Sequence, residues 1–383
     1  MYKTILWLYS KPLLPESGGT ERITSLTMKG LSECGHRCLG VLVVNTKDKT
    51  FVYNGFVVDN VYDFLNANKV DVVINQWGQL PDFLRLFLDK GGEKWHCEGG
   101  NIISCLHFDP RPYSLFYQFL MKKNKSLHDY YVMIKAKLFF ERFAREDMMR
   151  QGHVLKQVYD MSDKYVILSE GNRNYLTKAM SVSDASKIYV INNPLTFGIV
   201  SYNEIIKEKK NVILVVARMY EYHKRISLVL KTWERLCKLP RFDNWTLKIV
   251  GDGENLPDYV KYVKSHRLSR VTFEGQQNPE KYYKEAKIFL MTSKMEGWGQ
   301  TITEALQYGV VPIAFDTSAS FHDIISNGMN GILVKESNLT GFVKAIFILA
   351  TDDMKWDKMS RCAIESVKKF KLEEITKKWE NII

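Results

Sequence analysis

Long apolar runs and paired cysteines are both missing from this sequence. No stretch approaches the roughly 20 consecutive apolar residues that span a bilayer as a helix, so we expect no transmembrane segment. The six cysteines are scattered along the chain without a Cys-x-x-Cys pair, which argues against a disulfide framework and against a zinc site. Free thiols in a reducing cytoplasm fit this usage best.

Three further signatures are lacking. No Asp-x-Asp occurs anywhere, so a divalent metal bound through such a motif is not indicated. The paired glycines at Gly18-Gly19 and at Gly251-Asp-Gly253 do not extend to the Gly-x-Gly-x-x-Gly pattern of dinucleotide-binding proteins. The apolar run near the N-terminus stops at Lys11 and has neither a basic leader nor a small-residue cleavage site, so it predicts a first strand and not a secretory signal.

What is present is typical of a globular protein with two domains. Hydrophobic residues make up 45% and charged residues 25% of the 383 residues, and this length exceeds what one hydrophobic core usually organises. The net charge of +11 indicates an anionic partner, which is nucleic acid, an acidic membrane face or a phosphate-bearing substrate. Nucleic acid is disfavoured, because we find no RNP-type aromatic motif, no zinc-finger spacing and no obvious recognition helix.

Short β-rich apolar runs alternate with segments of helical length along the chain. This alternation is typical of parallel sheets covered by helices, and it restarts after the polar, lysine-rich stretch 202–210. The expected strands are residues 4–10, 37–44, 71–76, 101–107 and 164–169 in the first half, and 211–217, 246–251, 271–275, 287–293, 310–316 and 331–334 in the second. We therefore predict an α/β protein with two doubly wound, Rossmann-like domains.

The boundary between the domains is predicted at about residue 198, because Asn-Asn-Pro at 192–194 breaks regular structure and charged residues follow. The predicted parts are an N-terminal domain of residues 1–198, a C-terminal domain of residues 199–365 and a final helical segment of residues 366–383. Residues 113–151, which are rich in Phe, Tyr, Lys and Arg, are expected to form a long helical segment. An ordinary hairpin with a solvated basic face is the preferred interpretation, and a membrane-docking surface is the alternative.

The sharpest local pattern is the run Ser-Lys-Met-Glu-Gly-Trp-Gly-Gln-Thr-Ile-Thr-Glu at residues 293–304. It follows an expected strand, and open α/β sheets bind ligands at the carboxyl ends of their strands. Gly297 and Gly299 clear side chains from the backbone, and a helix that begins near Thr301 would offer free N–H groups to a phosphate.

The two glutamates of this run have different alternative explanations. Thr301-x-x-Glu304 has the spacing of a capping box, which by spacing alone is as good an explanation for Glu304 as a ligand-binding role. Glu296 has no helix of its own to cap, and for it the alternative is a solvated loop carboxylate.

A second candidate loop follows the expected strand 211–217 and contains Arg218, Lys224 and Arg225. An arginine fork and a lysine could neutralise the charge of a departing nucleoside diphosphate, although basic residues also gather on ordinary surfaces. In the first domain, Gly18 and Gly19 open a helix where a phosphate could approach the backbone. His107 ends an apolar strand and could reach a ligand, but a lone histidine is more often structural.

Together these residues resemble the family 4 retaining glycosyltransferases of GT-B fold, in which two Rossmann-like domains face each other across a nucleotide-sugar cleft. The resemblance spans nearly the whole chain. Its most specific part is MEGWGQTITEALQYGVVPIAFD at residues 295–316, which is similar to the family's EGFG-type loop, helix and following strand. The longer run through residue 325 looks most like enzymes that build bacterial surface polysaccharides.

The resemblance implies a role for each candidate residue. Glu296 faces the donor sugar, Glu304 binds the nucleotide ribose, and Arg218 and Lys224 bind the diphosphate; because many members have one residue fewer between those two, Arg225 is a substitute for Lys224. Gly18 and Gly19 lie beside the donor phosphates, and His107 contacts the donor sugar from the acceptor domain. The implied catalytic set is Glu296, His107, Arg218 and Lys224, and the implied donor-binding set is Gly18, Gly19, Arg218, Lys224, Glu296, Gly297, Trp298, Gly299, Gln300, Thr301 and Glu304.

The implied activity is that of a retaining hexosyltransferase that acts without a metal or another cofactor. It would transfer a sugar from a UDP- or GDP-sugar to a glycan or lipid-linked saccharide in polysaccharide synthesis, in the cytoplasm or peripherally on the inner membrane face. The final helix is expected to cross back to the first domain. Two alternatives stay open: a sugar-nucleotide epimerase of GT-B-like fold and a non-catalytic polyanion-binding protein.

Overall fold

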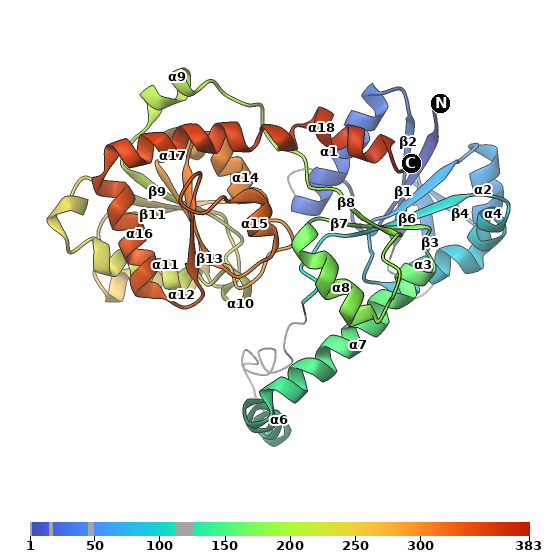
Figure 1. Cartoon of the computed structure of the whole chain (residues 1–383), viewed down its shortest axis with the longest axis horizontal. Coiled ribbons are helices and arrows are strands. Elements are labelled where there is room, and N and C mark those ends of the chain that lie inside the picture. Colours follow the sequence, from blue (N-terminus) through green and yellow to red (C-terminus); the bar gives the residue numbers. More distant parts are fainter. Residues whose placement is uncertain (1, 15–17, 45–49, 112–125) are drawn as a thin grey trace. The chain divides into compact units, whose positions relative to one another are not determined.

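The computed structural model describes residues 2–14, 18–44, 50–111 and 126–383 (Figure 1). They form two compact units, of which the first comprises Met1–Pro194 with Leu372–Ile383 and the second Leu195–Lys371. The sequence placed the division at residue 198 and the start of the last segment at residue 366. The final helix, α18 (Leu372–Glu380), lies against α1 (Gly19–Glu33) in the first unit.

The first unit is built on a mostly parallel sheet of eight strands in the order β4-β3-β2-β1-β5-β6-β7-β8. The strands are β1 (Thr4–Tyr9), β2 (Arg37–Val44), β3 (Thr50–Tyr53), β4 (Phe56–Val58), β5 (Val72–Asn75), β6 (Asn101–Leu106), β7 (Lys164–Ile167) and β8 (Ile188–Val190). Central strands of this kind are buried on both faces, and the residues from Ile5 to Leu8 are at most 1% exposed. The predicted parallel α/β architecture is confirmed.

A hairpin at the edge of this sheet was not predicted. β3 pairs antiparallel with β2 and with β4, and the turn between β3 and β4 consists of Asn54 and Gly55 with φ angles of 48° and 85°. Two consecutive left-handed residues are what a tight two-residue hairpin requires, and Asn-Gly is the pair that adopts them most readily. The signal for this hairpin was therefore present in the sequence.

The helices of the first unit connect these strands. They are α1, α2 (Val61–Ala67), α3 (Pro81–Phe87), α4 (Glu93–Cys97), α6 (Leu127–Leu138), α7 (Phe140–Asp160), α8 (Arg173–Met180) and α18. The expected helical segment 113–151 corresponds to α6 and most of α7, whereas its residues 113–125 lie outside the described part. None of the described helices combines the length and the apolar character needed to cross a membrane. All six cysteines are free.

The second unit has six parallel strands in the order β11-β10-β9-β12-β13-β14. The strands are β9 (Val212–Val216), β10 (Thr246–Val250), β11 (Val271–Gly275), β12 (Ile288–Met291), β13 (Val311–Asp316) and β14 (Ile332–Lys335). The helices are α9 (Tyr202–Ile205), α10 (Glu221–Lys224), α11 (Ile226–Leu236), α12 (Leu256–Ser265), α13 (Glu280–Glu285), α14 (Gln300–Gln307), α15 (Ser320–Ile324), α16 (Leu339–Thr351) and α17 (Asp353–Ser366).

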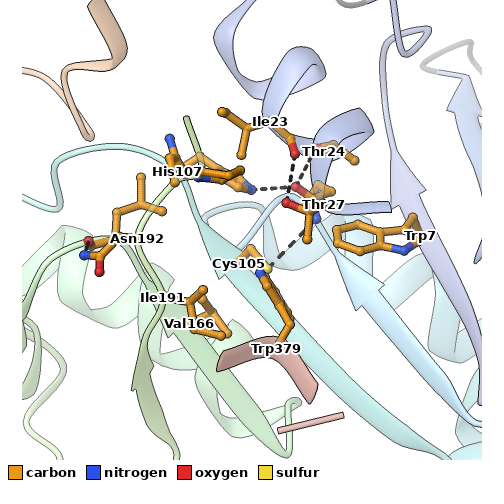
Figure 2. Close-up of a pocket in the computed structure, with 14 residues that line it drawn as sticks. Trp7, Ile23, Thr24, Thr27, Cys105, His107, Val166, Ile191, Asn192 and Trp379 are labelled. Carbon is orange, nitrogen blue, oxygen red and sulfur yellow. Dashed lines mark hydrogen bonds between the residues drawn. The ribbon is translucent and has the colours of Figure 1, made fainter. Parts of the chain in front are cut away.

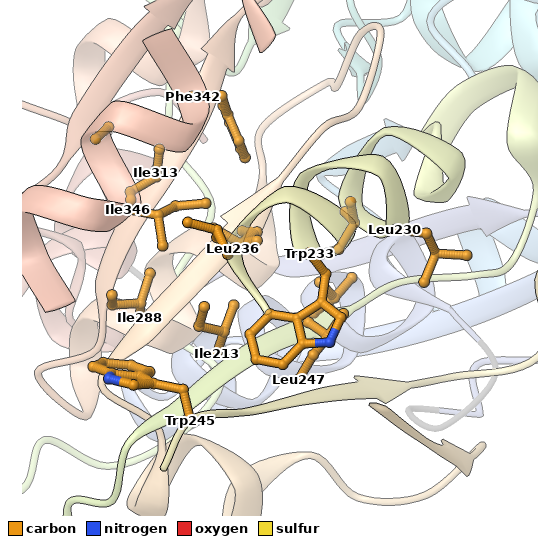
Figure 3. Close-up of a cluster of buried hydrophobic side chains, with 14 of the residues drawn as sticks. Ile213, Leu230, Trp233, Leu236, Trp245, Leu247, Ile288, Ile313, Phe342 and Ile346 are labelled. Carbon is orange, nitrogen blue, oxygen red and sulfur yellow. The ribbon is translucent and has the colours of Figure 1, made fainter. Parts of the chain in front are cut away.

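The core of the second unit lies between the sheet and two of these helices. Figure 3 shows Trp233 and Leu236 of α11 and Phe342 and Ile346 of α16 directed toward the apolar side chains of the strands. Trp233 is 1% exposed and its indole N–H donates to the Ser269 carbonyl at 2.9 Å. Burial of such a side chain stabilises the fold by about 1.5–3 kcal/mol, so this core fixes the loops at the strand ends.

Candidate active site

The carboxyl edge of the second sheet collects most of the predicted site residues. β9 lies between β10 and β12, and the chain runs from β9 outward to β10 and β11 before it returns to β12 on the other side. Such a switch point leaves space between the loops that follow the two central strands, and open α/β sheets bind their ligands there. Arg218 and Lys224 follow β9, and Glu296 follows β12.

Lys224 and Glu296 meet at this switch point. Their side chains form an ion pair and are 24% and 16% exposed. The Thr292 hydroxyl donates to the Lys224 carbonyl at 2.8 Å, and the backbone N–H of Glu296 donates to the Ser318 hydroxyl at 2.7 Å. Opposite charges attract more strongly in such a partly buried position than in open solvent. An anion that binds to Lys224 must therefore compete with Glu296.

Arg225 joins the same two loops through three hydrogen bonds. It adopts a left-handed conformation with φ of 51°. Its guanidinium donates to the carbonyls of Thr292 and Ser293 at 2.7 and 3.0 Å and to the Glu336 carboxylate at 2.8 Å. A guanidinium that binds backbone carbonyls in this way holds the loop after β12 in place. That Arg225 can substitute for Lys224 on a diphosphate stays a prediction.

Arg218 is exposed at the start of the loop after β9. The loop itself is anchored by Glu221, whose carboxylate accepts from the Ser227 backbone N–H at 3.1 Å and from the Tyr259 hydroxyl at 2.8 Å. A fixed loop that presents an exposed arginine beside Lys224 suits the binding of a phosphate group.

Two further basic side chains line this edge, and the sequence analysis did not single them out. Burial lowers the pKa of His223, and the neighbouring Lys224, Arg218 and Lys294 lower it further, against the opposing effect of Glu296. Burial also lowers the pKa of Lys294 to about 8, with Glu336 opposing the change and Arg225 adding to it. Lys294 stands two positions before Glu296 in the motif, which is the only signal that the sequence carried.

Helix α14 begins between the two glutamates. Its N-cap is Gly299, at φ of 96° and ψ of 49°, and no side chain caps the helix. The capping box that would have involved Thr301 is therefore not formed, because the helix starts two residues earlier than that motif requires. An uncapped helix N-terminus attracts anions.

Two side chains at the N-terminus of α14, those of Trp298 and Gln300, already have partners within the protein. Trp298 is 3% exposed and its indole packs edge-on against Phe370, with ring centroids 5.2 Å apart. Gln300 donates to the Thr196 hydroxyl at 2.9 Å.

Glu304 lies inside the unit and is 2% exposed. Its Oε2 accepts a hydrogen bond from the Tyr283 hydroxyl at 2.9 Å. A buried carboxylate requires such partners, because an unsatisfied charge is costly away from water. The structure thus places Glu304 on the inner side of α14, on the same short helix whose N-terminus follows Glu296.

In the first unit, Gly18 caps α1 and Gly19 is its first residue. Gly18 is extended, with φ of −176°, so left-handed backbone is not the reason for a glycine here. A Cβ at Gly18 would collide with the carboxylate of Glu21, which lies in the first turn of the helix. A phosphate at this turn would have to displace Glu21, since both anions are attracted to the same helix end.

His107 follows β6 and lies beside a small cavity of about 20 Å³, which has room for one water (Figure 2). Its Nε2 is 2.6 Å from Gln76 Oε1, which also accepts from the Thr24 hydroxyl at 3.0 Å. Burial lowers the pKa of His107 to about 4, so the imidazole is neutral near pH 7. Gln76 therefore orients His107, a contact that sequence reasoning did not anticipate.

The described residues contain no cluster of three or more His, Cys, Asp or Glu side chains that could hold a metal ion.

Known proteins resemble part of this chain in sequence. Residues 201–369 match the family model described as glycosyl transferases group 1. The amylovoran biosynthesis glycosyltransferase AmsD of Erwinia amylovora is 27% identical over 231 residues, which are 59% of this chain and 63% of that protein. A lipopolysaccharide 1,6-galactosyltransferase of Salmonella typhimurium is 26% identical over 203 residues, which are 51% of this chain and 54% of that protein. The alignments thus span less than two thirds of these relatives.

Solved structures share the fold over the full length. The lipopolysaccharide outer core galactosyltransferase WaaB superposes with a TM-score of 0.68 at 19% identity, covering 99% of this chain and 98% of that one. HepE of Anabaena, solved with UDP-glucose, superposes with a TM-score of 0.67 at 16% identity, covering 100% and 99%. The fold is GT-B, as the sequence predicted. Residues 201–369, which lie in the second unit, are similar to the group 1 glycosyltransferases.

Proposed function

We propose that the protein is a retaining glycosyltransferase that transfers a hexose-type sugar from a nucleotide sugar to a glycan or lipid-linked saccharide during synthesis of a bacterial surface polysaccharide. The observation that carries this proposal is the meeting of Lys224 and Glu296 at the β9/β12 switch point, beside the exposed Arg218 and the uncapped start of α14. This edge offers cations and a helix N-terminus to a diphosphate and a carboxylate to a sugar.

UDP is the favoured nucleotide over GDP. HepE was solved with UDP-glucose, and the pneumococcal O-GlcNAc transferase GtfA was solved with UDP and GlcNAc. The galactosyltransferase of Salmonella typhimurium and the glycosyltransferase of amylovoran synthesis support a bacterial surface glycan as the product. The second unit would bind the donor and the first unit the acceptor.

The proposed chemistry depends mainly on charge. The anomeric C–O bond breaks with its electron pair passing to the diphosphate, while the acceptor oxygen bonds to the anomeric carbon on the same face and its proton leaves with the diphosphate. Arg218 and Lys224 stabilise the charge that develops on the phosphates. Glu296 orients the donor sugar and supports its positive character in the transition state.

The test is nucleotide release and sugar transfer from a panel of UDP-, GDP- and ADP-sugars. We expect activity with one donor, and we expect Glu296→Ala and Arg218→Ala to lower it by at least about 100-fold. Glu285→Ala and Arg241→Ala are the matched controls, because Glu285 pairs with Lys210 at 3.1 Å away from the β9/β12 edge and Arg241 is an exposed arginine of the same unit.

Other outcomes of the same assay would overturn the proposal. A changed sugar still attached to its nucleotide would identify an epimerase. Absence of nucleotide binding, together with salt-dependent binding of unrelated polyanions, would identify a binding protein. We propose that no divalent metal is needed, since Arg218 and Lys224 supply the positive charge; activity that is abolished by a chelator and restored by magnesium would contradict this.

We further propose that the first unit docks peripherally on an anionic membrane through α6. One face of this helix carries Leu127, Tyr131, Ile134 and Leu138, which are 90%, 61%, 61% and 71% exposed. Their spacing is that of an amphipathic helix with an uncovered apolar stripe. The net charge of +11 favours an anionic surface over a neutral one, and a lipid-linked acceptor would be found there.

A further inference from the structure

Tyr283 is a buried residue of α13 that has no catalytic or binding role in the site described above. It is fully buried, and its hydroxyl donates to Glu304 Oε2 at 2.9 Å. A second and longer contact of 3.4 Å reaches the Thr301 carbonyl in the first turn of α14. The phenol is therefore directed at the start of the helix that carries three of the predicted donor-binding residues, Gln300, Thr301 and Glu304.

The ring of Tyr283 is held on several sides. Tyr308 stacks on it with centroids 6.2 Å apart and an interplanar angle of 6°. Phe197 lies edge-on at 6.3 Å, and Phe289 lies at 6.2 Å. Its backbone carbonyl accepts from the Lys209 ammonium at 2.9 Å. Aromatic contacts of this kind hold a ring in one orientation, so the hydroxyl is a fixed point in the structure.

We propose that Tyr283 is a positioning residue that holds the Glu304 carboxylate in the orientation needed to accept hydrogen bonds from the ribose hydroxyls of the donor nucleotide. The inference rests on the proposed function, because it assigns the nucleotide to this edge of the sheet. A carboxylate rotates about its last torsion with little hindrance. A rigid donor on Oε2 removes that freedom before the ligand arrives, and pre-organised partners bind more tightly.

The test compares two ligands by calorimetry: UDP and 2′,3′-dideoxy-UDP, which lacks the hydroxyls that Glu304 would recognise. We expect the wild-type protein to bind UDP about 10-fold more tightly or better, because hydrogen bonds to a charged acceptor are the strong ones. Tyr283→Phe and Glu304→Gln should each remove most of this preference and leave the affinity for the dideoxy ligand unchanged. The double variant should discriminate no worse than Glu304→Gln alone, because Tyr283 acts through Glu304.

Tyr282→Phe is the matched control. Its hydroxyl donates to Glu274 Oε2, also at 2.9 Å, from the same helix, so the variant removes an equivalent tyrosine–glutamate bond elsewhere in the unit. It should keep the full preference for UDP. In turnover, Tyr283→Phe should raise KM for the donor and leave kcat nearly unchanged, since the ribose does not react.

The outcomes separate this inference from the proposed function. If Tyr283→Phe weakens both ligands equally, Tyr283 is only a core tyrosine and the inference fails. If Glu304→Gln loses the preference while Tyr283→Phe keeps it, the positioning role fails but the ribose assignment stands. If the wild-type protein does not discriminate, or does not bind UDP, the assignment of Glu304 and the inference built on it fail together.

Discussion

At the level of single residues, the ion pair of Lys224 and Glu296 leads us to predict that one substitution strengthens UDP binding and lowers activity. Glu296→Gln removes the carboxylate that occupies Lys224 while it keeps the shape of the side chain. The freed ammonium can then pair with a phosphate at no competing cost. We expect UDP to bind several-fold more tightly and sugar transfer to fall by at least about 100-fold, measured by calorimetry and by turnover of the same preparation.

The control for this prediction is Lys224→Gln, which should weaken UDP binding and also abolish transfer. Equal or weaker UDP binding by Glu296→Gln would show that the pair does not compete with the diphosphate.

We predict that Lys294 makes UDP binding dependent on pH. Its pKa is lowered to about 8 by burial, so the side chain is charged below pH 8 and loses its proton above it. A bound diphosphate favours the charged form and raises the pKa, so binding is accompanied by proton uptake near pH 8. We expect the affinity for UDP to fall between pH 7 and pH 9.

Lys294→Arg should flatten this dependence, because a guanidinium keeps its charge throughout that range. Calorimetry in buffers of different ionisation enthalpy measures the proton uptake directly. An identical pH profile for the wild-type protein and Lys294→Arg would place the titration on another group.

At the scale of elements, α14 depends on the glycine at its start. Gly299 has φ of 96°, and a Cβ there would meet Phe321 Cε1 at 3.0 Å. Left-handed backbone costs a non-glycine residue about 1–2 kcal/mol, so we expect Gly299→Ala to lower the stability of the second unit by at least this amount and to weaken UDP binding. Gly198→Ala is the control in the thermal unfolding experiment, because nothing lies within 4 Å of its Cβ position; equal midpoints for the two variants would refute the argument.

The apolar stripe of α6 makes a second prediction at this scale. We expect the protein to float with vesicles that contain anionic lipid at low salt, and we expect the double variant Ile134→Glu, Leu138→Glu to stay in solution, because it places two charges on the exposed face. Phe56→Glu, at a site 78% exposed on β4, should bind vesicles as the unaltered protein does. Failure of the unaltered protein to float, or mass measurements that show α6-dependent dimers instead, would assign the stripe another partner.

At the scale of the whole molecule, the last helix contributes to the first unit across a long stretch of sequence. Trp379 of α18 is 6% exposed and its ring lies 5.8 Å from that of Trp7 in the central strand β1. Removal of a buried tryptophan side chain costs about 3–5 kcal/mol. We therefore expect Trp379→Ala to destabilise the first unit, which limited proteolysis should report as faster cleavage within residues 2–194. Unchanged cleavage there would mean that α18 is dispensable for this unit.

Much of this fold could be read from local patterns. Central strands such as β5 and β12 form buried, largely apolar runs, because a parallel strand covered on both faces is apolar along most of its length. The β3–β4 hairpin was not predicted, although Asn54-Gly55 is a strong signal for a two-residue hairpin turn. β8 was missed because three residues give too short a run to stand out.

The sequence by itself determined the two α/β units and the loops that carry Arg218, Lys224, Glu296 and Glu304, because spacing along a strand–loop–helix unit is local. Only the tertiary structure decided what each side chain does within those loops. Lys224 pairs with Glu296 while Arg225 clamps backbone carbonyls, and Tyr283 reaches Glu304 from another helix. These contacts join residues that are far apart in the chain. Tertiary packing decides which partner each charged side chain has, and a local sequence pattern contains no information about that packing.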